Sequence, residues 1–285
     1  MRFLRFRQGG KQGLAVIDGG GACGLTADHP DFPGEFETLV NQGSDALAAA
    51  ANRLRHGAAF DLETVELLPP IGGSGKILCL GLNYPDHAKE ANWDAPKAPT
   101  IFARYSSSIV GHLGKLVRPK VSQKFDYEGE LVAVIGKTGR HIPKEDALSH
   151  ILGYSIFNDG SIRDFQMETS QWTVGKNFDH SGSFGPWLVT ADEVAPGASG
   201  LKLQTRLNGQ VVQDASTAEM IFDVASTIAY LSQGITLVAG DVLVMGTAAG
   251  VGMARKPPLF MQPGDVCEVE IESLGVLSNT VIDEA

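Results

Sequence analysis

The segment DYEGELVAVIG, residues 126–136, contains two glutamates at a spacing suited to metal chemistry. Glu128 and Glu130 open an apolar run that we expect to be a strand, and side chains two residues apart lie on the same face of a strand. Two carboxylates held about 6–7 Å apart repel each other, and a cation would offset that repulsion. Oxygen ligands favour magnesium, manganese or calcium over zinc. The alternative is the polar face of an edge strand.

A further carboxylate, Asp159, follows the apolar run GYSIF and opens the segment DGSIRD. A residue at the end of a strand can reach into a cleft, so Asp159 is a candidate third metal ligand. The alternative is a turn or helix cap, because aspartate is common in both.

The segment GLNYPDHAKE places His87 and Glu90 three residues apart, a helical spacing that brings the two side chains together. Such a pair can activate a water molecule, with histidine taking the proton and glutamate orienting the ring. A solvated helix face would carry the same two residues.

Lys176 and the glycine-rich segment GTAAGVG, residues 246–252, are candidates for anion binding. The lysine can pair with a substrate carboxylate or an enolate oxygen. The Thr247 hydroxyl and the backbone N–H groups of Gly246 and Gly250 can do the same. A surface lysine and a close connection between strands are the alternatives.

These residues need a scaffold, and the pattern predicts one that is α+β and predominantly β. Asn208-Gly209 indicates a hairpin, and Ser216 with Glu219 resembles a capping box that opens a helix running to Gly234. Strands in runs with few helices between them favour antiparallel pairing over a doubly wound sheet. The expected strands after residue 75 are 76–81, 130–136, 151–159, 185–190 and 201–209.

The first part of the chain reads as a small α+β unit. Strands are expected at 2–6, 12–17 and 21–25, and an alanine-rich helix at 45–56. The segment LLPPIGGSGK, rich in proline and glycine, indicates a boundary near residue 73. We therefore predict an N-terminal domain at 1–72 and a larger domain at 73–285.

The composition narrows the class of protein. The 285 residues carry a formal charge of −10 and no long basic run, which argues against nucleic-acid binding. No segment has the roughly 20 apolar residues that would cross a membrane. Three widely spaced cysteines do not form a disulfide framework, so a reducing cytoplasmic location is expected.

In order along residues 76–282, seven segments resemble the signature blocks of the fumarylacetoacetate hydrolase family. They are GLNYPDHAKE, DYEGEL, NDGSIRD, GKNFD with FGPW, TAEMIFDV, GDVLVMGTAAGVG and PGDVCEVEIESLG. The resemblance implies a mixed β-sandwich roll, a homodimer and a divalent metal at the mouth of the roll.

Carried onto this chain, the family pattern implies Glu128, Glu130 and Asp159 as ligands of Mg²⁺ or Mn²⁺, with Ca²⁺ also compatible. It implies His87 and Glu90 on a lid, with Lys176 as the active-site lysine. Substrate-contact candidates in the matching blocks are Gln166, Thr247, Gly246, Gly250, Tyr84 and Arg163. Some members carry arginine where this chain has Leu82, which implies a different contact to a substrate carboxylate.

The expected activity is hydrolytic cleavage of a carbon–carbon bond in an acylpyruvate or related 2,4-diketo acid, giving pyruvate and a carboxylic acid. The alternatives are decarboxylation of an oxaloacetate-type acid and keto–enol isomerisation, which use the same metal and enolate. A more distant alternative is a non-catalytic, metal-stabilised binding protein. The expected partner is a small 2-keto acid.

Overall fold

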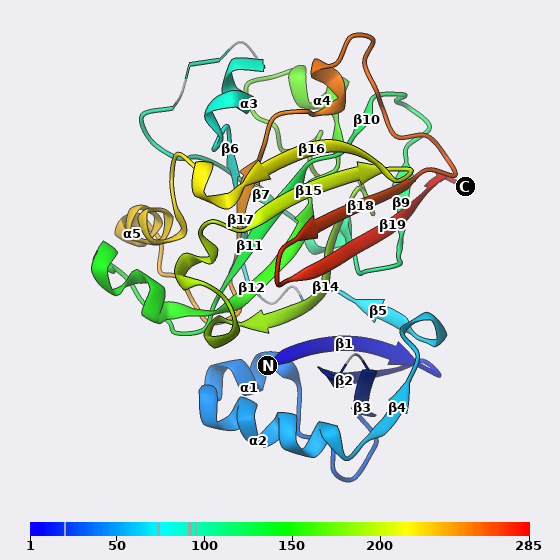
Figure 1. Ribbon diagram of the computed structural model, residues 1–285, viewed down its shortest axis with the longest axis vertical. Helices are drawn as coiled ribbons and strands as arrows, with labels where there is room; N and C mark the ends of the chain where they lie inside the picture. The colour runs from blue at the N-terminus through cyan, green and yellow to red at the C-terminus, as the bar shows by residue number, and fades with distance from the viewer. Residues whose placement is uncertain (20, 73–74, 91–92, 95) are drawn as a thin grey trace.

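The protein is built mainly of strands, as Figure 1 shows for the computed structural model, which describes residues 1–19, 21–72, 75–90, 93–94 and 96–285. This confirms the expected α+β, predominantly β, class. The largest sheet is mixed and has the order β4-β3-β2-β1-β14-β12-β11-β17-β6-β7, with β5 beside β1 and β8 beside β14. Its strands are β1 Arg2–Gln8, β2 Lys11–Asp18, β3 Gly21–Thr26, β4 Ala58–Phe60, β5 Glu66–Leu68, β6 Ile77–Gly81, β7 Thr100–Arg104, β8 Ile109–Val110, β11 Gly129–Ile135, β12 Ile151–Asn158, β14 Gly182–Thr190 and β17 Val242–Thr247.

A smaller sheet with the order β16-β15-β18-β19-β9 packs against the large one. Its strands are β9 Lys115–Arg118, β15 Lys202–Leu207, β16 Gln210–Ser216, β18 Val266–Ile271 and β19 Gly275–Asp283. A short pair is formed by β10 Phe125–Asp126 and β13 Ser161–Ile162. The helices are α1 Phe36–Gln42, α2 Ser44–Arg55, α3 Pro85–Glu90, α4 Arg163–Met167 and α5 Val224–Gly234.

Strand β11 is the centre of the core, because every residue from Gly129 to Ile135 is buried. On one face, Leu131, Ala133 and Ile135 pack with the smaller sheet and α5. On the other face, Val132 and Val134 belong to the cluster that includes α1 and α2. Burial of both faces explains the continuous apolar run of this strand. It also holds the polar residues at the start of the strand rigidly in place.

Residues 1–72 form the lower part of the molecule in Figure 1. Strand β1 joins them to the rest, since Arg2 and Phe3 pair with Val189 and Leu188 of β14. The predicted boundary near residue 73 lies outside the described residues, and the division into 1–72 and 73–285 stays a prediction.

The helix expected from Ser216 starts later than predicted. Ser216 caps only a 3₁₀ turn at Thr217–Glu219, and Met220 then takes an extended conformation. Helix α5 begins at Val224, and its first turn is capped by Asp223, which accepts a hydrogen bond from Ser226 N at 2.6 Å. The capping-box assignment was therefore wrong, because a better cap lies seven residues further on.

Pairing in the second part of the chain is mainly antiparallel, as expected, and parallel pairs join β17 to β6, β19 to β9 and β14 to β8. The hairpin at Asn208-Gly209 is confirmed by φ angles of 51° and 77° at the two turn residues. The sequence did not indicate α1, which precedes the expected helix α2.

Candidate metal centre and active site

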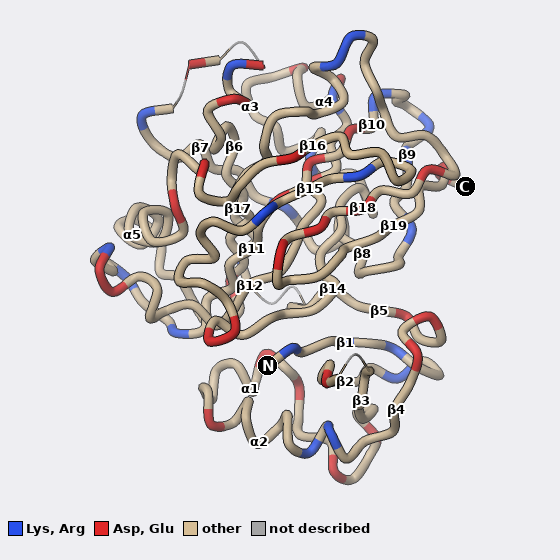
Figure 2. The backbone as a smooth tube through the Cα atoms, viewed as in Figure 1, with Lys and Arg blue, Asp and Glu red and all other residues tan. Residues whose placement is uncertain are grey.

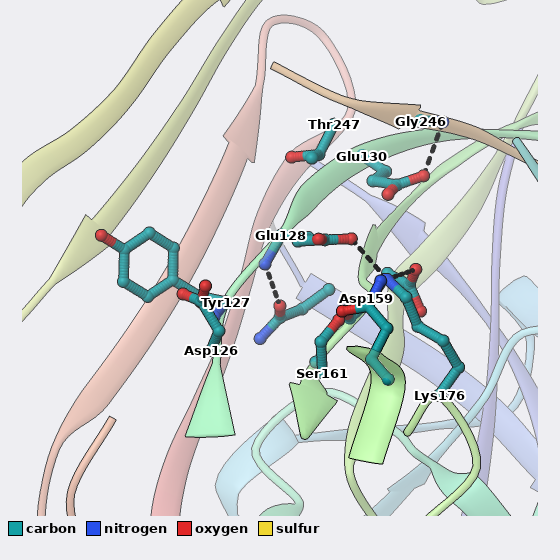
Figure 3. A network of polar contacts seen from close by, with 12 residues as sticks. Asp126, Tyr127, Glu128, Glu130, Asp159, Ser161, Lys176, Gly246 and Thr247 are labelled. Atoms are coloured by element: carbon teal, nitrogen blue, oxygen red, sulfur yellow. Dashed lines mark hydrogen bonds and ion pairs between the residues drawn. The ribbon is translucent and has the colours of Figure 1, made fainter. Parts of the chain in front are cut away.

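The antiparallel pairing of β11 with β12 brings three carboxylates together. Gly129 lies opposite Asn158, so Glu128 and Asp159 are neighbours at the open end of the strand pair, and Asp159 N donates to Glu128 O at 2.8 Å. Oxygen atoms of Glu128, Glu130 and Asp159, the acidic triad, all lie within 4.8 Å of one another (Figure 3). All three side chains are buried, so the edge-strand and turn alternatives do not apply.

Three buried cations surround the triad. Lys176 Nζ bridges Glu128 Oε2 at 2.7 Å and Asp159 Oδ2 at 2.6 Å. The Arg163 guanidinium lies 2.6 Å from Glu128 Oε1, and Arg104 Nη1 donates to Asp159 Oδ1 at 2.5 Å. Lys176 is thus a core residue and not the surface lysine of the alternative interpretation.

Glu130 differs from its two neighbours, because it makes no ion pair with any residue that the structure describes. Its Oε2 accepts the Gly246 N–H at 2.6 Å. Burial, followed by the charges of Asp159 and Glu128, raises its pKa well above the usual value. Burial also acts to raise the pKa of Glu128, but Lys176 and Arg163 outweigh it and lower that pKa to about 2.

The triad fits a divalent cation. Its ligand atoms all lie within 4.8 Å of one another, close enough to be bound by one ion with metal–oxygen bonds of about 2.1–2.4 Å. Each carboxylate offers about four lone-pair sites, so the bonds described above leave sites for a metal. A cation would also remove the repulsion that raises the pKa of Glu130.

The sequence did not single out Arg104, which holds the third ligand in place. Its side chain is fully buried, and besides Asp159 it donates to Gly160 O, Ser108 and Ser181. Together these contacts hold the guanidinium in one orientation. One Asp159 oxygen accepts a hydrogen bond from Arg104 and the other from Lys176. The only sequence signal is an arginine that ends the apolar run TIFA.

Asp126 is the second residue that was missed. It shares the period-two spacing of Glu128 and Glu130, yet in Figure 3 it points away from the triad. Its carboxylate accepts Arg163 Nε at 2.8 Å and the N–H groups of Gly252 and Met253 at 2.7 and 2.9 Å. It therefore positions an arginine of the site and the loop after β17.

The predicted His–Glu pair is formed on α3. His87 Nδ1 lies 2.9 Å from Glu90 Oε1, and both side chains line the same cavity as Glu128 and Glu130. His87 is 9% exposed, so a fully solvated helix face does not describe it. The Glu90 carboxylate also accepts the Gly250 N–H at 2.9 and 3.1 Å, which fixes the pair relative to β17.

The glycine-rich segment binds the protein's own carboxylates. The N–H groups of Gly246, Gly250 and Gly252 are directed to Glu130, Glu90 and Asp126, respectively. The predicted anion-binding role of the Gly246 and Gly250 N–H groups is thus filled within the chain. Thr247 lines the cavity, and its hydroxyl contacts Gly129 O and Gln213 Nε2.

The site opens into a cavity of about 600 Å³. Its walls combine the polar residues above with apolar and aromatic side chains, including Leu82, Trp93, Phe102, Met167 and Trp172. None of the described residues before Leu80 lines it. This volume lies in the range of about 300–1,000 Å³ that is typical of small-molecule sites.

The remaining substrate-contact candidates differ in position. Arg163 and Gln166 line the cavity and contact each other, and Arg163 Nη2 is buried without a partner among the described residues. Tyr84 is buried without a hydroxyl partner in the same set, and it is not among the described cavity-lining residues. Burial raises its pKa.

Comparison with known proteins places this geometry in a family. The family model described as "Fumarylacetoacetate (FAA) hydrolase C-terminal" matches residues 76–282, which include the triad, the His–Glu pair and Lys176. The chain belongs to the fumarylacetoacetate hydrolase family. This family is one of enzymes, and the resemblance noted from the sequence blocks is confirmed.

Relatives of this family align with nearly the whole chain. The human protein "Oxaloacetate tautomerase FAHD2A, mitochondrial" is 42% identical over 99% of this chain and 92% of that protein. The solved fumarylacetoacetate hydrolase from Exiguobacterium antarcticum is 36% identical, with a TM-score of 0.86 and full coverage of both chains. A solved 2-hydroxyhepta-2,4-diene-1,7-dioate isomerase from Mycobacterium marinum is 33% identical, with a TM-score of 0.77 over 100% of this chain and 99% of that one.

Proposed function

We propose that this protein is a metal-dependent keto–enol tautomerase of an oxaloacetate-type 2-keto acid. The observation that carries this proposal is one cavity that Glu128 and Glu130 of the acidic triad line together with Lys176 and the His–Glu pair. Support also comes from relatives, since several of those about 40% identical over nearly the full chain bear the name oxaloacetate tautomerase. Tautomerisation was the alternative activity in the sequence interpretation, and the hydrolase remains a second candidate.

The acidic triad would hold the divalent metal, and we propose Mg²⁺ or Mn²⁺ because three carboxylates are hard oxygen ligands. When bound, the metal would supply Lewis-acid stabilisation of negative charge on the 2-keto acid. Around the triad, four carboxylates, those of Asp126, Glu128, Glu130 and Asp159, face the three cations Arg104, Arg163 and Lys176. One negative charge is left over, so a divalent ion would make the site net positive and favourable for an anion.

The chain's own residues would bind the substrate and move its proton. The unpartnered Nη2 of Arg163 can donate to a substrate carboxylate, and the Lys176 ammonium can stabilise charge on the enolate oxygen. His87 keeps one ring nitrogen on Glu90, which leaves the other to exchange a proton with the substrate. The enol loses its hydroxyl proton, the double bond moves from C2=C3 to C2=O, carbon 3 gains a proton, and no carbon–carbon bond is cleaved.

Hydrolysis of an acylpyruvate is the second candidate, and the same His–Glu pair favours it. A histidine held by a carboxylate can activate water for attack on a distal carbonyl. The cavity also has room for an acyl group beyond the 2-keto acid, because about 600 Å³ exceeds the volume of a four-carbon acid. Decarboxylation needs no activated water and uses only the metal end of the site.

One assay distinguishes the three reactions. Enol-form oxaloacetate and a panel of acylpyruvates are added to magnesium-loaded protein, and loss of the enol absorbance is followed together with pyruvate formation. Tautomerisation predicts faster loss of the enol band from oxaloacetate with no matching pyruvate. Pyruvate from acylpyruvates would indicate hydrolysis, and pyruvate from oxaloacetate would indicate decarboxylation. Two controls are included. Wild-type protein without metal lacks the ion, and the Glu128→Gln variant lacks one of its proposed ligands.

We further propose that the chain forms a homodimer in a reducing compartment such as the cytoplasm. The family resemblance supports the dimer, and sedimentation of the purified protein tests it. Free thiols at Cys23, Cys79 and Cys267 support the compartment. None of the described helices is long and apolar enough to cross a membrane.

A further inference from the structure

Two basic residues follow the glycine-rich segment and line the cavity without a role in the chemistry above. Arg255 and Lys256, the basic pair, lie on the loop between β17 and β18. Arg255 is half-buried and Lys256 is exposed. In Figure 2 this loop carries a blue segment at the top of the molecule, close to α4.

The Arg255 guanidinium is held in place by neutral groups alone. Its Nε donates to Tyr127 Oη at 3.1 Å and to Gly250 O at 3.2 Å, and its Nη2 donates to Val212 O at 2.6 Å. Within the described part of the chain, neither Arg255 nor Lys256 makes an ion pair. Arg163 and Lys176, the other cations of the cavity wall, both bind carboxylates.

The carboxylates of the cavity wall are already engaged elsewhere. Glu128 is bound by Lys176 and Arg163, Glu90 by His87 and the Gly250 N–H, and Glu130 by the Gly246 N–H. Among the described residues, no carboxylate forms an ion pair with the basic pair. Neutral hydrogen bonds fix a guanidinium but leave its charge available, and a cation already held in place loses little freedom on binding an anion.

The loop that carries the basic pair is itself anchored. The Gly252 and Met253 N–H groups donate to Asp126 at 2.7 and 2.9 Å, and a Cβ at Gly252 would lie only 1.9 Å from Leu259 O. The hydrogen bonds to Asp126 hold the loop against β10, and the close approach of Gly252 to Leu259 packs the loop on itself. The cavity wall also includes Met167, Met253 and other apolar side chains that suit a carbon chain.

We propose that the basic pair is the subsite for the distal carboxylate of the oxaloacetate-type substrate and selects a dianion over a monoanion. The 2-keto acid end would lie at the triad and the distal carboxylate at Arg255 and Lys256. This inference rests on the proposed function for the identity of the reacting end. It also accounts for capture of a dianion by a chain of formal charge −10, because local positive charge offsets the repulsion.

The test compares substrates that differ only in distal charge. Enol-form oxaloacetate and its 4-methyl ester are assayed with magnesium-loaded protein, and kcat/KM is measured for Arg255→Gln, Lys256→Gln and the double variant. The loss on the dianion should exceed the loss on the ester by at least about 10-fold in the double variant, as expected for lost hydrogen bonds to a charged group. Equal losses on both substrates, or none, would overturn the proposal.

Lys11→Gln with Arg55→Gln is the matched control, because it removes two positive charges that pair with Asp28 and Asp18 far from the cavity. It should leave the preference for the dianion unchanged. Lys256→Gln guards against misfolding, since an exposed side chain is removed without touching the Arg255 anchors.

A binding measurement separates this proposal from the proposed function. Calorimetry with magnesium-loaded protein compares oxalate, which reaches only the metal end, with 2-oxoglutarate, which adds a distal carboxylate. The double variant should weaken 2-oxoglutarate binding by about 10-fold more than oxalate binding. If wild-type protein turns over neither enol while this difference persists, the tautomerase assignment fails and the anion subsite stands. If wild-type protein turns over the enols but shows no preference for the dianion, the tautomerase assignment stands and the anion subsite fails.

Discussion

At the scale of single residues, the three carboxylates of the acidic triad differ in whether a cationic side chain is paired with them. Glu128 and Asp159 form ion pairs with Lys176, Arg163 and Arg104, whereas Glu130 has no cationic partner among the described residues. The triad thus contains two carboxylates with buried counter-ions and one, Glu130, whose negative charge is unfavourable until a cation is present. Metal binding and the stability of the metal-free protein are therefore opposed at Glu130.

Replacing Glu130 by Gln should weaken magnesium binding by at least about 10-fold, because one charged ligand is lost. The same change should leave the metal-free protein as stable as the parent or more stable, since it removes a buried carboxylate whose pKa is raised by burial, Asp159 and Glu128. Calorimetry and thermal unfolding without metal measure the two effects. Unchanged magnesium affinity would contradict the ligand assignment.

Replacing His87 by Ala should lower turnover by about 100- to 10,000-fold, the usual range for loss of a general acid or base. Metal affinity should stay unchanged, and metal-assisted decarboxylation should fall less than tautomerisation or hydrolysis. Lys89→Ala is the control, because Lys89 lies on the same helix and pairs with Asp86 on its exposed face. Equal losses in all three reactions would instead indicate a general defect of α3.

At the scale of elements, strand ends supply the proposed metal ligands and a loop orients the proposed reacting groups. The start of β11 and the end of β12 carry the triad, and both strands are buried. Within the sheet, Gly246 of β17 donates its N–H to Glu130, whereas the loop after β17 holds Glu90 and Asp126 through the N–H groups of Gly250 and Gly252. Position of the triad is therefore set by sheet register, and position of the His–Glu pair by one glycine-rich loop.

A substitution at Gly250 can separate the contribution of the sheet register from that of the glycine-rich loop. Its φ of +105° favours glycine, and a Cβ would lie 2.2 Å from the Val212 carbonyl oxygen. Gly250→Ala should displace the loop and Glu90, lowering turnover at least about 10-fold while magnesium affinity changes little. Gly209→Ala is the control, since Gly209 also has positive φ but faces open space. A parallel loss of metal affinity would show that loop and triad are not independent.

The connection between β8 and β9 should make stability depend on pH. Burial lowers the pKa of His112 to about 4, and its Nδ1 accepts the Ser278 N–H at 3.0 Å. Because the folded pKa is below the unfolded value of about 6.5, this stability is present above pH 6.5 and is lost as pH falls toward 4. His112→Gln should reduce the change in unfolding free energy between pH 7 and pH 5 relative to wild type, as urea titrations can measure. His29→Gln, at an exposed position, should retain the wild-type change.

At the scale of the whole molecule, residues 1–72 contribute to the core and not to the cavity. Phe3 packs in the cluster that also contains Val132 and Phe157 of the central strands. Every described cavity-lining residue comes from Leu80 onward. The first part of the chain therefore packs with the core through β1, and we predict that it supplies no groups to the reaction.

Phe3→Ala should lower the free energy of unfolding by about 3–5 kcal/mol, because a buried aromatic side chain is removed. Below the melting temperature, turnover per folded molecule should remain near that of wild type. Arg7→Ala, which breaks an exposed pair with Glu66, is the control and should cost about 1 kcal/mol or less. Loss of turnover in folded Phe3→Ala protein would show that this unit takes part in the reaction.

Local patterns in the sequence determined the main elements and the candidates for chemistry. Apolar runs predicted β11 and β12, the Asn208-Gly209 turn predicted its hairpin, and the spacing of His87 and Glu90 predicted their contact. These succeed because strand and helix periodicities act between near neighbours. The capping-box prediction failed for a local reason as well, since Asp223 competes with Ser216 for the helix start.

Tertiary structure alone decided which distant groups share the site. Arg104 meets Asp159 across 55 positions, and Gly250 meets Glu90 across 160, through sheet register and loop packing that no local pattern encodes. Burial was equally beyond the sequence, because Lys176 and Glu130 look like surface residues until the strands around them are assembled. Long-range packing determines how deeply each of these groups is buried and which charges lie beside it. It also leaves the basic pair without a counter-ion among the described residues.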